Sequence, residues 1–438
     1  MSPTNLVSVG VLAIVFAAVI VRQGTGRGPG IWAIFLGGAF LTVATDVLSV
    51  TGAENAVAQS FPVLLFLFAL FLFAGALERA GALDHLARWI VGRARRAADL
   101  PAFLFVGFGI ASAFLVNDAL VLVGVPLLFA VARQVRVDPK PLLLVLAFSV
   151  TVGSVLTPFG NPQNLLVSVS SGLSDPVSVF LRYLLLPTGI NLAFGAWYLK
   201  RSFSPAMRSG ESEFEAARRP APPLFPTGGW RARLLRYPVL WVFPGTILVI
   251  ITLDATAALT RGPVIPIWEL AAAGGMLLLV LSPGRTQIVH RVNWTVLLLF
   301  AGLFVVVGGA VAGGVVSAAE GFLPIPGPGH TASAVAAIVV TSAVGSQVVS
   351  NVPWVALQIP LFSTLGYGSS TPIAWVALAA ASTLAGNLTL LGAASNLIIA
   401  EQSEKAGVPF RLGPFVRYGA PLAFVTFVVL WATLALGL

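Results

Sequence analysis

Polar residues that could bind an ion or a solute interrupt a long apolar segment. They lie at residues 157–164, which read T-P-F-G-N-P-Q-N. Two prolines remove backbone donors and a glycine relaxes the dihedrals, so we predict that a helix breaks here. A break inside the membrane frees carbonyl groups that can coordinate a cation, and the N-terminus of the following half-helix can face an anion or a polar solute. The alternative is a simple kink with capping side chains. The candidate binding residues are Thr157, Gly160, Asn161, Gln163 and Asn164.

A second polar motif, N-L-T-L-L-G-A-A-S-N at residues 387–396, lacks proline but keeps a glycine and asparagines. We predict a second break here, and the candidate binding residues are Thr389, Gly392, Ser395 and Asn396. The neighbouring pair Gly386-Asn387 fits helix packing as well as ligand binding.

Two further apolar stretches, 101–132 and 332–365, are interrupted in the middle by Asn117-Asp118 and Ser350-Asn351. Each half is short for a crossing, at about 14 to 18 residues against about 20 for a span, so we predict two re-entrant hairpins. We include Asn117, Asp118, Ser350 and Asn351 among the binding residues. An ionised carboxylate is costly in apolar surroundings and is functional there by default. Asp118 is therefore the candidate for proton coupling, or for pairing with a bound cation; its alternative is a neutral acid that caps the turn.

The composition identifies the setting of these motifs. Of 438 residues, 57% are hydrophobic and only 9% are charged, against about 25% charged residues in soluble domains. The chain is therefore a polytopic membrane protein of the all-α class. It contains no cysteine, which excludes disulfides and thiolate chemistry, and its three histidines lie far apart. No metal centre, nucleotide-binding loop or enzyme motif is present, and we expect no enzymatic activity.

Ten segments are apolar enough to be spans, and the first shows no cleavage signal. They lie at 5–21, 30–48, 59–78, 141–171, 177–199, 237–259, 264–281, 294–316, 373–400 and 416–437.

Positive charges orient these spans. With both hairpins re-entrant, 23 of the 25 Lys and Arg residues face the cytoplasm, and only Arg182 and Arg261 face outside. The net charge of +9 thus indicates membrane orientation rather than nucleic-acid binding. We expect an inner (plasma) membrane protein with both termini outside. The polar stretch 201–236 is predicted to be a cytoplasmic linker, and 82–97 a surface helix.

The two halves repeat each other at an offset of about 232–235 residues. We expect repeat 1 at 1–200 with hairpin 101–132, and repeat 2 at 237–438 with hairpin 332–365. Each repeat holds five spans, an odd number, so the second enters the membrane inverted. Inverted repeats with broken helices are typical of secondary transporters, whose solute lies near the midplane. Identical residues at matched positions are Thr151/Thr383, Leu156/Leu388, Thr157/Thr389, Gly160/Gly392, Asn164/Asn396 and Leu165/Leu397.

Each half contains a hairpin asparagine that is followed by a proline and then by a helix break. This repeated pattern resembles that of the ion transporter superfamily, and the resemblance covers essentially the whole chain. That group contains arsenite permeases, citrate and dicarboxylate/sodium symporters, sodium/proton antiporters and silicon effluxers. The resemblance implies that Asn117 and Asn351 are tip residues, and that the breaks at 160–164 and 392–396 complete the ion and solute sites. Sodium-coupled dicarboxylate members carry Ser-Asn-Thr at both tips, whereas this chain has Asn117-Asp118 and Ser350-Asn351-Val352. The Asn-Asp tip is more similar to the arsenite permeases.

We therefore expect a proton-coupled secondary transporter for a small inorganic oxyanion or hydroxide, with arsenite or antimonite as the first candidate. A sodium-coupled carboxylate or sulfate symporter is the alternative, with sodium near Asn117, Gly160 and Asn164. An ion channel is the alternative from another class. The expected coupling ion is H⁺ or Na⁺, and no other cofactor is expected. The expected partners are the small solute and the lipid bilayer, with a homodimer left open and no nucleic acid.

Overall fold

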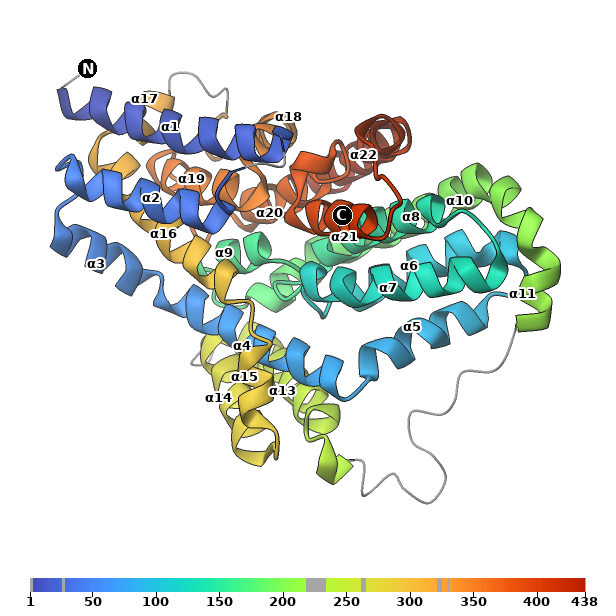
Figure 1. Cartoon of the computed structure of the whole chain (residues 1–438). Coiled ribbons are helices and arrows are strands. Elements are labelled where there is room, and N and C mark those ends of the chain that lie inside the picture. Colours follow the sequence, from blue (N-terminus) through green and yellow to red (C-terminus); the bar gives the residue numbers. More distant parts are fainter. Residues whose placement is uncertain are drawn as a thin grey trace.

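The computed structural model describes residues 3–25, 28–217, 234–260, 265–320, 325–329 and 331–437. Within these ranges the chain is helical and forms no strand, which confirms the all-α class (Figure 1). The helices up to residue 217 are α1 (Pro3–Thr25), α2 (Ile31–Ala44), α3 (Val50–Gln59), α4 (Phe61–Arg79), α5 (Ala82–Arg93), α6 (Leu100–Ser112), α7 (Asn117–Val135), α8 (Pro139–Gly153), α9 (Pro162–Ser170), α10 (Pro176–Met207) and α11 (Glu211–Ala217). The later helices are α13 (Val239–Thr260), α14 (Ile267–Leu281), α15 (Arg285–His290), α16 (Trp294–Ala312), α17 (Val315–Glu320), α18 (Thr331–Val349), α19 (Asn351–Thr364), α20 (Pro372–Ala385), α21 (Ala394–Lys405) and α22 (Leu412–Ala435).

Every predicted span coincides with one helix or with a broken pair of helices. Eight helices of the described residues are long and apolar enough to cross a membrane. The short helices α3, α15 and α17 were not predicted, because each has at most ten residues and carries too little periodicity to detect.

Two helices meet at each predicted tip, α6 and α7 at Asn117 and α18 and α19 at Asn351. That these pairs are re-entrant stays a prediction. The expected arm length of 14 to 18 residues is wrong for all but α19, because α6 has 13 residues, α7 and α18 have 19, and α19 has 14. Pro126 lies inside α7 and does not end it. Neighbouring helices pack against the hairpins: α6 and α7 lie on α8, and α18 lies on α20 and α22.

Both predicted helix breaks are present. α8 ends at Gly153 and α9 begins at Pro162, with a short 3₁₀ turn and the T-P-F-G-N motif between them. α20 ends at Ala385 and α21 begins at Ala394, again with a 3₁₀ turn, Leu390–Gly392, between them. Pro162 occupies the first turn of α9, where its missing N–H costs no hydrogen bond.

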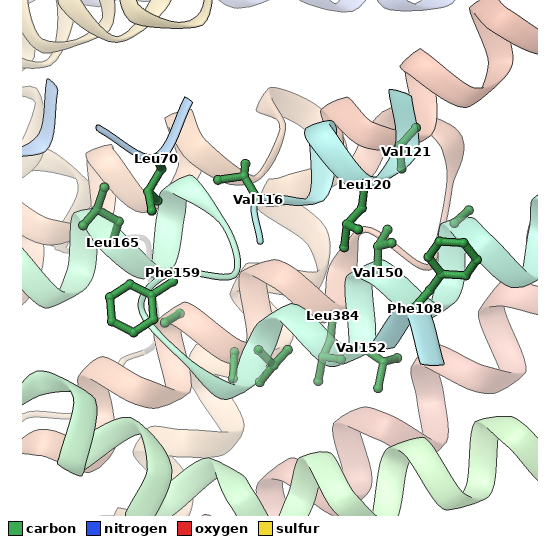
Figure 2. Close-up of a cluster of buried hydrophobic side chains, with 14 of the residues drawn as sticks. Leu70, Phe108, Val116, Leu120, Val121, Val150, Val152, Phe159, Leu165 and Leu384 are labelled. Carbon is green, nitrogen blue, oxygen red and sulfur yellow. The ribbon is translucent and has the colours of Figure 1, made fainter. Parts of the chain in front are cut away.

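Apolar side chains enclose the first break and the first hairpin tip (Figure 2). Figure 2 shows Val116 of the tip among α4, α7 and α8 residues, and Phe159 of the break beside Leu165. Phe159 also stacks on Phe66 of α4, with ring centroids 5.9 Å apart. The polar side chains between these residues are thereby shielded from water and must bond to one another or to a ligand.

The region predicted as a linker is partly helical. α10 continues to Met207, and α11 follows it to Ala217; residues 218–233 lie outside the described ranges. Glu211 accepts a hydrogen bond from the Ala97 backbone N–H at 3.2 Å, and Glu213 lies 3.6 Å from Arg136 at the end of α7. A hydrogen bond from Ser212 and the Arg136 charge hold the pKa of Glu213 below its usual value. Residues 201–217 thus pack at the base of the first hairpin.

Candidate solute and ion site

Buried and half-buried amides and hydroxyls lie together at each helix break. We call Asn117, Ser154, Thr157, Asn161, Gln163 and Asn164 the first amide cluster, and Gln347, Asn351, Asn387, Thr389, Ser395 and Asn396 the second amide cluster. The first lies where the tip of the α6–α7 hairpin meets the α8–α9 break, and the second lies where the α18–α19 hairpin meets the α20–α21 break.

Asn164 organises the first amide cluster. Its side-chain Nδ2 donates to the backbone carbonyls of Ser154 at 2.9 Å, Val155 at 3.3 Å and Thr157 at 3.0 Å. Its backbone N–H is capped by the Asn161 Oδ1 atom at 2.8 Å. The carbonyls freed by the break are therefore satisfied by one side chain, as buried backbone groups require.

The hairpin tip is tied to the break through Asn117. Its backbone N–H donates to the Gly160 carbonyl at 3.3 Å. With its amide oriented to satisfy both ends, Nδ2 donates to the carbonyls of Val150 and Gly160, each at 3.1 Å, and Oδ1 accepts from Ser154 Oγ at 3.2 Å. Glycine is required at position 160 by the close approach of Ser154, because a Cβ there would lie 2.3 Å from the Ser154 carbonyl oxygen. The atoms considered for sodium near Asn117, Gly160 and Asn164 thus bond mainly to one another.

Thr383 of α20 joins the first amide cluster to the second half of the chain. Its Oγ1 accepts from Asn161 Nδ2 and from Gln163 Nε2, each at 3.1 Å, and lies 3.2 Å from Asn164 Oδ1. The two breaks therefore lie next to each other. The hairpins cross between halves in the same way, because α7 packs on α21 and α19 packs on α9.

The second amide cluster repeats the bonding of the first at an offset of 232 residues. Asn396 Nδ2 donates to the Gly386 carbonyl at 2.7 Å and to the Thr389 carbonyl at 3.4 Å, which correspond to the Asn164 bonds to Ser154 and Thr157. Thr389 Oγ1 donates to Gln347 Oε1 at 2.7 Å, and Gln347 Nε2 donates to the Ala385 carbonyl at 2.8 Å. The two halves therefore repeat each other in their hydrogen bonds as well as in their sequence.

Buried polar atoms without a partner distinguish the second amide cluster. They are Asn351 Oδ1, Asn387 Oδ1 and Nδ2, Ser395 Oγ and Asn396 Oδ1, whereas the described side chains of the first amide cluster leave no such atom. Smaller residues cause the difference, since Ser154 and Asn161 correspond to Gly386 and Ala393. A buried polar group without a hydrogen bond costs about 1–3 kcal/mol. The second amide cluster therefore offers groups that a bound solute or ion would satisfy.

The second hairpin tip also carries backbone strain. Ser350 has φ 71° and ψ 163°, a region that essentially only glycine occupies. Its counterpart in the first tip, Val116, has φ −55°. Strain of this kind occurs at ligand sites, where the surrounding structure enforces it.

Asp118 does not join the amide clusters. It is buried, with 8% of its surface exposed, and it lines a separate crevice with Glu78, Arg291 and Asn293. Consecutive residues of a helix point about 100° apart, so Asn117 faces the break while Asp118 faces α4. The two residues thus have different surroundings, although both lie in the first turn of α7.

The amide clusters contain no cation of the protein. In the described part of the chain the buried polar residues include no Lys or Arg, and the two buried carboxylates, Asp118 and Asp254, lie outside both clusters. No group of three His, Asp or Glu residues that could hold a metal is found there. The clusters can therefore bind through amides, hydroxyls, carbonyls and helix N-termini.

All predicted break residues lie in the amide clusters or at their edges, as do Asn117, Ser350 and Asn351. The prediction omitted Ser154, Gln347, Thr383 and Asn387 as binding residues. Thr383 was visible as an identical pair with Thr151, and Asn387 as part of the second motif, but neither signal separates binding from packing. Glu78 and Arg291 lie at the ends of helices, where a charge is ordinary, so no sequence signal marked them.

Comparison with known proteins places the fold. The family model described as citrate transporter matches residues 11–385. An uncharacterized transporter of Mycobacterium tuberculosis is 29% identical over 83% of each chain, and a silicon efflux transporter of Oryza sativa subsp. japonica is 28% identical over 84% of each chain. The crystal structure of the Alcanivorax borkumensis YdaH transporter, described as having an unusual topology, superposes with a TM-score of 0.60 and 14% identity, covering 88% of this chain and 87% of that chain. The chain belongs to the citrate transporter family, a group of membrane transport proteins within the superfamily that its motifs indicated.

Proposed function

We propose that this chain is a secondary active transporter that moves a small inorganic oxyanion or hydroxide of the arsenite or antimonite kind by alternating access, coupled to protons. The observation that carries this proposal is the set of five partnerless polar atoms in the second amide cluster. They include oxygen acceptors, one hydroxyl and one amide donor. A small hydroxide presents both O–H donors and oxygen acceptors, so it can bond to groups of either kind.

Charge favours a neutral solute over a carboxylate. Arsenous acid carries no charge near neutral pH, so its transfer into a cluster of amides needs no counter-ion. A citrate-like solute brings two or three carboxylates, and burying them without Arg or Lys is expensive. No such cation is buried in the described residues. The name of the rice relative, a silicon efflux transporter, supports a small hydroxide as well.

A sodium-coupled carboxylate or sulfate symporter is the second candidate. Hard cations bind oxygen ligands, and three of the partnerless atoms are amide oxygens, those of Asn351, Asn387 and Asn396. The citrate name of the family model also supports it. An ion channel has less support, because repeated broken helices are typical of transporters that alternate access.

The proposed coupling residue is Asp118. Asp118 is buried, and its matched residue Val352 carries no charge. It lies in the first turn of α7, next to Asn117, whose backbone contacts the first break. Asp118→Asn keeps the shape and hydrogen-bonding capacity but cannot release a proton. We expect it to abolish solute accumulation driven by a pH gradient while solute exchange continues.

Flux into proteoliposomes tests both parts of the proposal. Arsenite, phosphate, citrate and sulfate are offered in turn under an imposed proton or sodium gradient. The proposal predicts arsenite flux that follows the proton gradient and is lost in Asp118→Asn. Citrate or sulfate flux that requires sodium would establish the second candidate, and proton-driven flux that survives Asp118→Asn would remove Asp118 from the coupling step.

A further inference from the structure

A crevice separate from the amide clusters leads to the tip of the first hairpin. It has a volume of about 40 Å³ and lies between α4, the start of α7 and the segment that joins α15 to α16. Its lining includes Ala74, Glu78, Asp118, Ala119, Arg291 and Asn293. At its inner end lies the Asp118 carboxylate, which is 92% buried and for which the structure gives no hydrogen bond or ion pair.

The polar residues of the crevice lining are Glu78, Asp118, Arg291 and Asn293. At the rim Glu78 and Arg291 form an ion pair, and their side chains are 47% and 42% exposed. The remaining wall is largely apolar, with Phe71, Ala74 and Leu122. An exposed rim and a buried carboxylate at the far end are what an aqueous path into a membrane protein requires.

The ion pair holds together two segments that are 213 residues apart in sequence. Gly75 makes this possible, because a Cβ at that position would lie 2.9 Å from the Arg291 Cβ atom. Arg79, the next cation along α4, bonds instead to Gln287 at 2.8 Å and does not line the crevice. The pair therefore joins α4 to the segment that follows α15, on the side of the protein where the charge pattern predicts the cytoplasm.

We propose that this crevice is the cytoplasmic access route by which water and the coupling ion reach the tip of the first hairpin, and that the Glu78–Arg291 ion pair is the gate that closes it. The role of the route rests on the proposed function, which places coupling at this tip. Opening requires only that one exposed ion pair separates. Such pairs contribute at most about 1 kcal/mol, so loss of the pair should increase opening by up to about fivefold.

The natural absence of cysteine permits a direct test by thiol labelling. Ala119→Cys places a thiol inside the crevice, and Ala76→Cys places one on buried α4 outside it. Both are exposed to a charged, membrane-impermeant methanethiosulfonate reagent in inside-out and right-side-out vesicles. We expect the thiol at position 119 to react from the cytoplasmic side only, and the thiol at position 76 to stay unreactive.

The gate is tested in the Ala119→Cys background. Glu78→Gln and Arg291→Gln should each accelerate labelling by about fivefold, and the swapped pair Glu78→Arg with Arg291→Glu should restore the slow rate. Arg79→Gln is the matched control and should leave the rate unchanged. If a neutralised variant does not fold, Gly75→Ala provides a second approach, because its methyl group displaces Arg291 without removing a charge.

Labelling only from the outer face, or equal rates with and without the ion pair, would overturn this proposal. The labelling needs no solute and no gradient, so its outcome is separate from the flux result. If labelling shows that the crevice opens as expected while proton-driven flux is unchanged in Asp118→Asn, the gate is retained and the coupling role of Asp118 is excluded.

Discussion

The two amide clusters share a bonding plan but differ in how completely they are satisfied. In the first, Asn164 bonds three carbonyls, and Asn161 and Gln163 reach Thr383 of the other half. In the second, Asn396 keeps two of the equivalent bonds while five polar atoms have no partner. The first therefore ties the hairpin tip to the break, whereas the second has polar groups that a ligand would satisfy.

Two of the substitutions between the repeats explain this difference. Asn161 caps α9, but its counterpart Ala393 has no side-chain acceptor for α21. Val155 is apolar, whereas its counterpart Asn387 brings an amide into a fully buried position without a partner. Both halves thus contain a helix break, but only the first has side chains that bond all of its buried polar groups.

The largest difference is expected from the paired asparagines at 164 and 396. Asn164→Ala leaves three buried carbonyls unbonded and should lower the free energy of unfolding by about 3 kcal/mol. Asn396→Ala removes two bonds, one of them long, together with an oxygen that has no partner, and should cost only about 1 kcal/mol. Thermal unfolding of the purified variants measures both. Equal losses would contradict the asymmetry.

Asn387 should matter for transport more than for stability. Asn387→Ala removes a buried amide that has no partner, so the free energy of unfolding should not fall, while solute flux should fall at least about tenfold through loss of one binding group of about 1.4 kcal/mol. The control is the counterpart, Val155→Ala, which should lose stability through a cavity and keep its flux. A folded Asn387→Ala protein with full flux would exclude this residue from the site.

The strain at the hairpin tips gives the smallest effect. Ser350→Gly relieves a conformation that favours glycine and should raise the free energy of unfolding by about 1 kcal/mol. Val116→Gly, at an ordinary φ, should lower it by a similar amount, about 1 kcal/mol, through added freedom of the unfolded chain. Chemical denaturation compares the two variants. A destabilised Ser350→Gly protein would show that the strain is not stored at this tip.

The sequence predicted the long apolar helices from their composition. It predicted both breaks and both hairpin tips because proline, glycine and polar residues inside apolar runs are costly in a helix that continues unbroken through a membrane. It did not predict that Asp118 and Asn117 face different surroundings, because neighbouring residues of a helix project their side chains in different directions. It also did not separate the filled cluster from the open one. That distinction depends on whether Gly386 and Ala393 leave neighbouring amides unpartnered, and only packing between distant segments decides it.

The most direct test of the central claim is equilibrium binding of arsenite to purified protein carrying a substitution at one of two matched positions, Ser395 and Gln163. Ser395 Oγ has no partner, whereas Gln163 Nε2 donates to Thr383 at 3.1 Å. The account predicts that Ser395→Ala weakens binding by about tenfold, or about 1.4 kcal/mol, and that Gln163→Ala changes the affinity by less than about twofold. Weaker binding in Gln163→Ala together with unchanged binding in Ser395→Ala would contradict it and place the solute in the first amide cluster.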